Sequence, residues 1–225
     1  MQENIKIVKT EDGSCTLYLQ SMDETYHSTH GALGESLHVY IKNGLEKLKD
    51  RKELNILEIG FGTGLNALLT LDHQQKQQHI NYYTIEPFPL DGETLKLYYQ
   101  QFVEPPFHLD LLADMAGAHP GLALQLTPEF SFCLLQKTLQ SVQVADVHQK
   151  AFDLVYYDAF GPSKQPEMWE IETVRKATDM IASKGILSTY CAQGQFKRNL
   201  KSLGLEVENP EGAMGKRQMT VAIKS

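Results

Sequence analysis

Apolar and polar residues alternate along this chain with two different periods. Short, nearly continuous apolar runs are typical of buried strands, and they predict strands at 54–59, 81–85, 130–135, 152–157, 186–190, 205–209 and 218–223. Apolar positions at helical spacing predict helices at 35–48, 65–76, 91–102, 166–182 and 195–203. This alternation ends in a pair of strands. It predicts an α/β fold with a Rossmann-like, seven-stranded sheet whose last strand is antiparallel.

The N-terminal part has a different pattern. Residues 5–20 predict two strands around a turn at 11–13, which is a short β-hairpin extension beside the main sheet. The polar stretch 21–34 has no periodicity, as is typical of functional and of solvated loops. We therefore expect a single domain over 1–225, with the hairpin and loop at 1–34 and the core at 35–225. The pattern is weak at 103–126, and it leaves 137–145 open between a helix and a strand.

The segment 54–66, LNILEIGFGTGLN, places three glycines directly after the first buried strand. Gly60, Gly62 and Gly64 have no Cβ, so a ligand can approach their backbone closely, and the first N–H groups of the next helix would face it. Their spacing, G-x-G-x-G, differs from the G-x-G-x-x-G of dinucleotide-binding folds. Together with Glu58 it is similar to the E-x-G-x-G-x-G motif of methyltransferases that use S-adenosylmethionine (SAM).

An acidic residue ends the next predicted strand. Glu86 follows Gly64 by 22 residues, which in a doubly wound sheet puts a carboxylate within reach of a ribose diol. The alternative is a surface glutamate at a strand end. Phe88 lies two residues further on, and it is interpreted either as a neighbour of an adenine face or as a core residue.

Composition argues against several classes of protein. The 225 residues carry a net charge of −7, which argues against a uniformly basic nucleic-acid surface but allows local basic patches. The N-terminal sequence is polar and no apolar run reaches about 18 residues, so we expect neither a signal peptide nor a membrane span. Cys15, Cys133 and Cys191 form no C-x-x-C pair, which favours a reduced, cytoplasmic protein. We expect no metal, because His27 and His30 are interpreted as solvated loop residues despite their H-x-x-H spacing.

Three blocks of sequence together resemble one family of tRNA-modifying enzymes. They are GFGTGLN at 60–66, DAFGPSKQPEMW at 158–169 and GAMGKRQM at 212–219. Over roughly residues 12–223, the chain resembles the methyltransferase domain of the bifunctional MnmC proteins and its stand-alone counterpart, MnmD.

The resemblance implies SAM as the cofactor and a defined reaction. The reaction is N-methylation of the 5-aminomethyl group of the wobble uridine in tRNA, which gives 5-methylaminomethyl-(2-thio)uridine. The implied partners are the tRNA anticodon stem-loop and a separate oxidase or other tRNA-modifying enzyme that supplies the aminomethyl group. Because no second dinucleotide-binding motif occurs before Ser225, we expect only the methyl-transfer step and no flavin.

The glycine turn and the resemblance together define a candidate site. Its predicted cofactor-binding residues are Tyr26, Glu58, Gly60, Gly62, Gly64, Asn66, Glu86, Phe88 and Asp158. Asp158 is also the expected catalytic group, because a protonated amine must lose its proton, for example to a carboxylate, before it attacks. Its alternative role is to cap a helix or brace a loop. Phe160 and Pro162 would form an apolar wall for a flipped-out base.

Two further sets of residues concern the adenine and the tRNA. The family usually has a Gly-Asp pair after the fourth strand, and this chain has LQKT at 135–138 instead. Gln136, Thr138 or a backbone group would then hold the adenine. The residues predicted to contact tRNA phosphates are Lys164, Lys197, Arg198, Lys216 and Arg217. Each of these alone is equally consistent with a solvated side chain.

Three other functions stay open. The first is a SAM-dependent methyltransferase that acts on a small molecule or a protein. The second is an aminopropyl transferase of the spermidine-synthase type, whose N-terminal loop resembles residues 23–27. The third is a catalytically degenerate fold that serves as an RNA-binding scaffold, which the LQKT departure favours.

Overall fold

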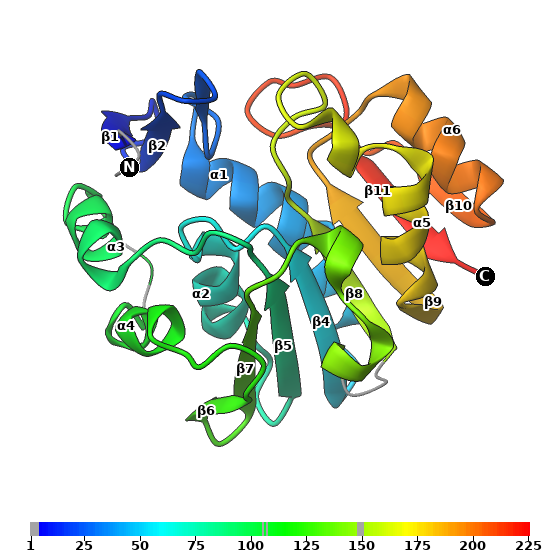
Figure 1. Cartoon of the computed structure of the whole chain (residues 1–225), viewed down its shortest axis with the longest axis horizontal. Coiled ribbons are helices and arrows are strands. Elements are labelled where there is room, and N and C mark those ends of the chain that lie inside the picture. The colour runs from blue at the N-terminus through cyan, green and yellow to red at the C-terminus, as the bar shows by residue number, and fades with distance from the viewer. Residues whose placement is uncertain (1–4, 105, 107, 148–150) are drawn as a thin grey trace.

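A central sheet with helices on both faces organises the chain, shown in Figure 1 as a computed structural model. The structure describes residues 5–104, 106, 108–147 and 151–225. Residues 1–4 of the predicted segment 1–34, and residues 105 and 107 of the segment 103–126, therefore lie outside the described residues. Within those residues the sheet has eight strands. In spatial order they are β10 (Leu205–Glu208), β11 (Thr220–Lys224), β9 (Ile181–Thr189), β8 (Phe152–Tyr157), β4 (Glu53–Ile59), β5 (His79–Ile85), β7 (Phe130–Leu135) and β6 (Leu124–Thr127).

The α/β fold is confirmed, but the number of strands is not. Strands β7, β5, β4, β8 and β9 run parallel, and β11 is inserted antiparallel between β9 and β10 as predicted. The eighth strand, β6, forms a tight hairpin with β7 at the edge of the sheet. The sequence did not reveal it, because its four residues are partly exposed and give no apolar run.

The helices are generally shorter than predicted. They are α1 (Ala32–Ser36), α2 (Leu65–Asp72), α3 (Gly92–Tyr99), α4 (Asp110–Ala116), α5 (Ile171–Asp179) and α6 (Gly194–Ser202). A π-helical turn, η1 (Leu37–Lys42), continues α1, and 3₁₀-helical turns occur at η2 (Leu45–Leu48), η3 (Leu139–Ser141), η4 (Val144–Val147) and η5 (Pro166–Met168). Figure 1 shows α5 and α6 on one side of the sheet and α2 on the other.

Two predicted helices were wrong in detail for identifiable reasons. The helix at 35–48 is interrupted at Gly44, whose φ of −116° and ψ of −86° are not helical. The helix at 166–182 ends early, because β9 already begins at Ile181. Gly185 therefore lies inside β9. A Cβ there would lie 2.9 Å from the backbone oxygen of Phe152, at the point where the pairing of β8 with β9 shifts register.

The N-terminal extension is a small sheet and not a simple hairpin. Its strands β1 (Ile5–Lys9), β2 (Cys15–Leu19) and β3 (Glu24–Thr25) pair antiparallel. Strand β2 is buried, and the hydroxyl of Tyr98 on α3 donates a 2.6 Å hydrogen bond to the Cys15 carbonyl. This contact fixes the extension against the helical layer, so that the chain beyond β3 enters the core at a defined place.

The order of the strands determines where a ligand can bind. Strand β4 lies between β5 and β8, so the connection that leaves β4 runs towards β5 and the connection that leaves β8 runs the opposite way, towards β9. In such sheets ligands bind outside the carboxyl ends of the strands at this switch point. The glycine turn, Glu86 and Asp158 all follow strands that end there. Within the described residues, no helix is both long and apolar enough to cross a membrane.

Candidate active site

The turn after β4 needs its glycines. Gly60, Gly62 and Gly64 have φ values of +95°, +51° and +76°, which favour glycine. A Cβ on Gly60 would lie 2.4 Å from the backbone oxygen of Asp158, and one on Gly62 would lie 3.0 Å from the ring of Tyr26. The turn therefore packs directly against the end of β8 and against the N-terminal extension.

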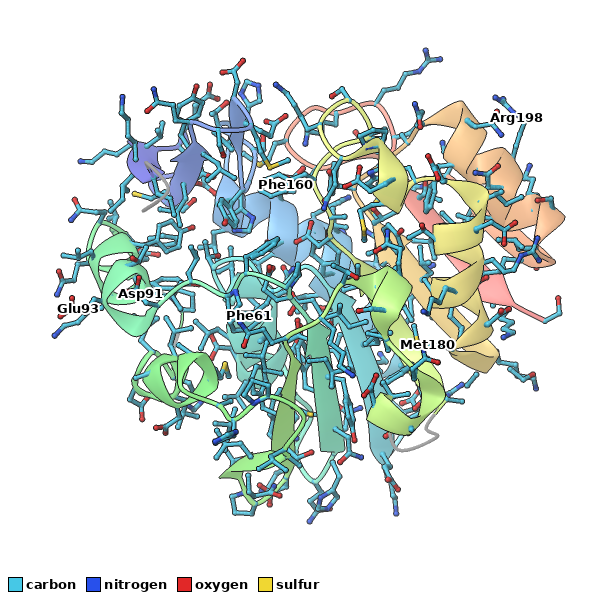
Figure 2. All side chains as sticks on the ribbon, in the orientation of Figure 1. Phe61, Asp91, Glu93, Phe160, Met180 and Arg198 are labelled. Carbon is cyan, nitrogen blue, oxygen red and sulfur yellow. The ribbon has the colours of Figure 1, made fainter. Side chains whose placement is uncertain are left out.

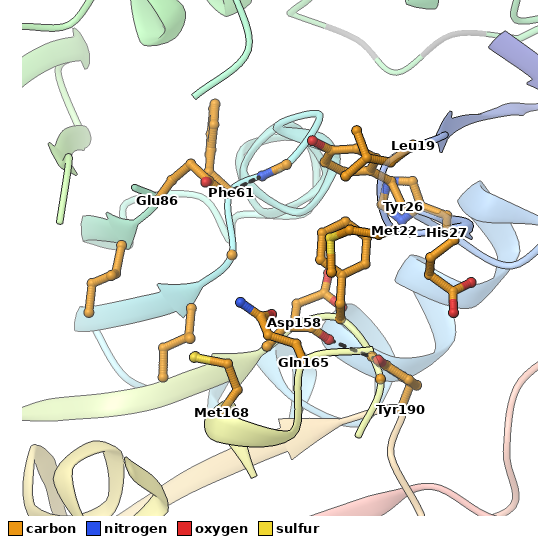
Figure 3. Close-up of a pocket in the computed structure, with 18 of the residues that line it drawn as sticks. Leu19, Met22, Tyr26, His27, Phe61, Glu86, Asp158, Gln165, Met168 and Tyr190 are labelled. Carbon is orange, nitrogen blue, oxygen red and sulfur yellow. Dashed lines mark hydrogen bonds between the residues drawn. The ribbon is translucent and has the colours of Figure 1, made fainter. Parts of the chain in front are cut away.

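A cavity of about 560 Å³ opens at this edge of the sheet (Figure 3). Of the residues predicted from the sequence, it is lined by Tyr26, Gly60, Gly62, Glu86, Phe88, Thr138, Asp158, Phe160 and Lys216. Figure 3 shows Met22, Tyr26 and His27 together on one side, with Gln165 and Met168 on another. The volume lies in the range of small-molecule and cofactor sites.

Asp158 is held from two directions. Its Oδ1 accepts a 2.5 Å hydrogen bond from the Tyr40 hydroxyl, and its Oδ2 accepts a 2.8 Å bond from Nδ2 of Asn66. Burial raises the pKa of Asp158 from 3.8 to about 7, although these two hydrogen bonds and the charge of Lys216 act in the opposite direction. Asp158 can therefore exchange a proton near neutral pH.

Glu58, Gly64 and Asn66 lie behind the cavity wall. The Glu58 carboxylate is fully buried and accepts hydrogen bonds from Asn66 at 3.1 Å and from Thr84 at 2.9 Å. Burial and the charge of Asp158 hold the pKa of Glu58 well above its usual range. These three residues do not line the cavity. In this structure they support the turn and, through Asn66, Asp158. Their predicted contact with the cofactor stays a prediction.

Glu86 and Phe88 lie together at the end of β5. Glu86 accepts hydrogen bonds from the backbone of Gly62 at 3.3 Å and of Phe88 at 2.9 Å, and burial raises its pKa. The Phe88 side chain is 79% exposed, which excludes the core interpretation left open by the sequence. Gln136 and Thr138 are both exposed, but only Thr138 lines the same cavity. Of these two candidates for holding the adenine, the geometry favours Thr138.

Aromatic residues fix the loop after β8. Trp169 Nε1 donates to the Phe160 carbonyl at 2.8 Å, and the Tyr190 hydroxyl donates to the Ala159 carbonyl at 2.8 Å. The ring of Phe160 meets that of Tyr26 edge-to-face, with 5.2 Å between centroids. Phe160 and Tyr26 line the cavity together, whereas Pro162 does not line it, and its predicted place in an apolar wall for the base stays a prediction.

The five basic residues predicted to contact tRNA do not form one patch. Lys216 forms an ion pair with Glu35 inside the cavity and lies over the Tyr190 ring, and Lys164 donates to backbone carbonyls of the N-terminal extension. Lys197 and Arg198 lie on α6 and bond to glutamines, away from the cavity; Figure 2 shows Arg198 apart from Phe160. Arg217 is exposed. Lys164 and Lys216 therefore have protein partners that the sequence did not indicate.

Sequence reasoning missed several residues of the site. His27 was interpreted as solvated, yet its Nε2 lies 2.9 Å from the Thr63 hydroxyl, and burial lowers its pKa to about 4. Tyr40, Glu35 and Tyr190 also line the cavity. The sequence assigned no site role to these three residues, because Tyr40 occupies an ordinary apolar helix position and the others lie far along the chain from their partners.

Comparison with known proteins identifies the class. Residues 124–225 match the family model described as S-adenosyl-L-methionine-dependent methyltransferase. The crystal structure of MnmC2 from Aquifex aeolicus matches with a TM-score of 0.80 at 27% identity, covering 98% of this chain and 70% of that one. DesVI from Streptomyces venezuelae shares the fold, with a TM-score of 0.50 at 11% identity over 86% of this chain and 92% of that one. The chain is a SAM-dependent methyltransferase.

The sequence relatives narrow this class. The chain is 30% identical over 219 residues to the tRNA 5-methylaminomethyl-2-thiouridine biosynthesis bifunctional protein MnmC of Azoarcus sp., over 93% of this chain and 34% of that protein. Identity to the MnmC of Cupriavidus metallidurans is 32% over 225 residues, 96% of this chain and 33% of that protein. The chain therefore spans about a third of the length of these relatives. Over most of its length the chain is similar to this part of the MnmC proteins, and its cofactor is SAM.

Proposed function

We propose that this chain transfers a methyl group from SAM to the 5-aminomethyl nitrogen of the wobble uridine in tRNA. The MnmC relatives are named for the biosynthesis of 5-methylaminomethyl-2-thiouridine in tRNA, and the methylamino group of that base is the product of such a transfer. The observation that carries the proposal is the carboxylate of Asp158, which lines the cavity beside the glycine turn and the Phe160 wall.

The lining residues fit SAM by their chemistry. Gly60 and Gly62 leave the backbone open to a close approach, and the Glu86 carboxylate offers an acceptor for a ribose diol. Phe88 offers an apolar face for adenine, and Thr138 offers a hydroxyl. When bound, SAM supplies a methyl group on a positively charged sulfur. We assign these five residues to its binding.

Asp158 supplies the proton chemistry of the transfer. A primary alkylamine is protonated in neutral water and has no lone pair with which to attack. With a pKa of about 7, Asp158 is ionised in a sufficient fraction to accept that proton. Bound SAM would supply the methyl group to the freed nitrogen lone pair, with its thioether as the leaving group. Tyr40 and Asn66 hold the carboxylate in place during this exchange.

The charge of the cavity favours a cationic substrate. Among the described lining residues, Glu24, Glu35, Glu86, Asp158 and Glu167 are acidic, and Lys216 is the only lysine or arginine. An ammonium group is attracted into such a site and a phosphate is repelled. The aminomethyl base therefore enters the cavity, and the tRNA phosphates are bound outside it.

The proposal also concerns partners and location. A tRNA with an aminomethyl group must be supplied by a preceding enzyme, such as a separate oxidase. The anticodon stem-loop is the part of the tRNA that this chain contacts. Because tRNA is the substrate, we propose that the chain acts in the cytoplasm.

One incubation with methyl-labelled SAM tests the function. The acceptors are a tRNA that bears 5-aminomethyluridine, the same tRNA without that group, and putrescine. We expect label in the first alone. D158N should lower the rate by about 100-fold or more, and D114N, at an exposed site on α4, should not. Label in either other acceptor would contradict the substrate assignment, and absence of SAM binding would favour the scaffold alternative.

A further inference from the structure

Lys164 makes its contacts to another part of the chain. Its Nζ donates to the backbone carbonyls of Met22 at 3.1 Å and of Asp23 at 2.7 Å, and it lies 3.7 Å from the Asp23 carboxylate. The Lys164 side chain is 29% exposed. An ammonium group has three N–H donors, and two of them are used on this segment.

The loop that carries Lys164 is a fixed support. The backbone N–H groups of Lys164 and Gln165 both donate to the Gly161 carbonyl, at 2.8 and 2.9 Å. Trp169 and Tyr190 donate to the carbonyls of the two residues before Gly161. Lys164 therefore extends from a well-braced turn towards the segment of residues 22–27.

That segment continues directly onto the glycine turn. The Tyr26 ring packs on Gly62, where a Cβ would lie only 3.0 Å away, and His27 bonds to Thr63 within the same turn. The edge-to-face contact of Tyr26 with Phe160 joins the same segment to the loop after β8. Residues 22–27 thus connect the loop after β8 with the loop after β4, and Lys164 contacts the end of this segment that is remote from the glycines.

We propose that Lys164 is a positioning residue for the SAM site: it holds residues 22–27 across the glycine turn, so that Tyr26 forms a wall of the cofactor half of the cavity. Asp23 at the held end has a φ of +48°, a backbone conformation that is uncommon for a non-glycine residue. The two carbonyl bonds from Lys164, to Met22 and to Asp23, help to hold this turn. This inference deepens the proposed function, and it replaces the sequence-based assignment of Lys164 to a tRNA phosphate.

The affinity for S-adenosylhomocysteine, the demethylated form of SAM, tests this role by calorimetry. K164M keeps the length of the side chain and removes its donors, so we expect the dissociation constant to rise about tenfold, the scale of one charged hydrogen bond. K164R keeps donors and should restore most of the affinity. The matched control is K224M, because Lys224 also donates to backbone carbonyls, those of Thr178 and Ile181, remote from the cavity.

The salt dependence of tRNA binding separates the two roles of Lys164. A lysine that neutralises a phosphate contributes about one unit to the slope of log affinity against log salt. We expect the slope of K164M to equal that of the unchanged chain. Unchanged S-adenosylhomocysteine affinity in K164M, or a slope reduced by about one, would overturn the proposal. If K164M does not fold, K164Q takes its place, with the same expected loss and the same contrary results. The calorimetric experiment needs no tRNA. It therefore tests the role of Lys164 even if the proposed tRNA substrate is wrong.

Discussion

Replacing Tyr40 by Phe would remove one of the two hydrogen bonds that hold Asp158. The Tyr40 hydroxyl lies 2.5 Å from Oδ1 of Asp158, and this bond lowers a pKa that burial raises to about 7. A hydrogen bond to a charged group contributes about 1.5–3 kcal/mol, and one pKa unit corresponds to about 1.36 kcal/mol. In Y40F the pKa of Asp158 should therefore rise by about 1–2 units.

The direction of the effect on rate follows from the proposed role. Asp158 must be ionised to accept the amine proton, so activity increases as pH rises through its pKa. With that pKa shifted to about 8–9, the ionised fraction at pH 7 falls to about 1–10%. We expect kcat/KM at pH 7 to drop about 5- to 50-fold and to recover largely at high pH.

The assay is the pH profile of kcat/KM, which reports groups of the free enzyme. Y156F is the control, because the Tyr156 hydroxyl is equally buried and lies 3.2 Å from that of Thr70. The acid limb of the Y156F profile should lie at the same pH as that of the wild-type chain. An acid limb in Y40F that does not move, or that moves equally in Y156F, would refute the assignment of Asp158 as the proton acceptor.

Three further changes probe the site. E86Q should weaken S-adenosylhomocysteine binding about tenfold in calorimetry and leave tRNA binding unchanged; equal affinity would exclude a ribose contact. G60A, whose Cβ would lie 2.4 Å from the Asp158 backbone oxygen, should lower the free energy of unfolding in urea by about 2 kcal/mol or more, whereas G92A, with open space around it, should not. The pKa of Asp158 is raised from 3.8 to about 7 on folding, so the unfolded chain loses its proton first and stability decreases from about pH 4 to pH 7. D158N should therefore raise the Tm at pH 8 more than at pH 4; equal shifts would contradict the raised pKa.

Local patterns determined much of the fold. Continuous apolar runs identified β4, β5, β7 and β8, because strands buried on both faces have few polar positions. The glycine turn was recognisable because positive φ and close backbone contacts both require glycine. Edge strand β6 and the early start of β9 were missed, because their residues are partly exposed and their positions depend on the neighbouring strand.

For the candidate site, too, the sequence determined some features and missed others. The sequence alone placed Glu86 and Asp158 at the ends of core strands, since each follows an apolar run directly. It could not tell that Glu58 supports the turn from behind, because a strand residue faces one side or the other according to register and burial. It could not show that Phe88 is exposed either.

Only the tertiary structure decided which partners the polar side chains have. Tyr40 meets Asp158 across 118 residues of sequence, Lys164 meets Met22 across 142, and Lys216 meets Glu35 across 181. Sequence periodicity reports on neighbours within one or two turns of a helix or a few positions of a strand. The sequence by itself therefore determined the turn, the strands and the acids at their ends. The fold decided which donors hold those acids, and it turned two lysines predicted to bind RNA towards the protein.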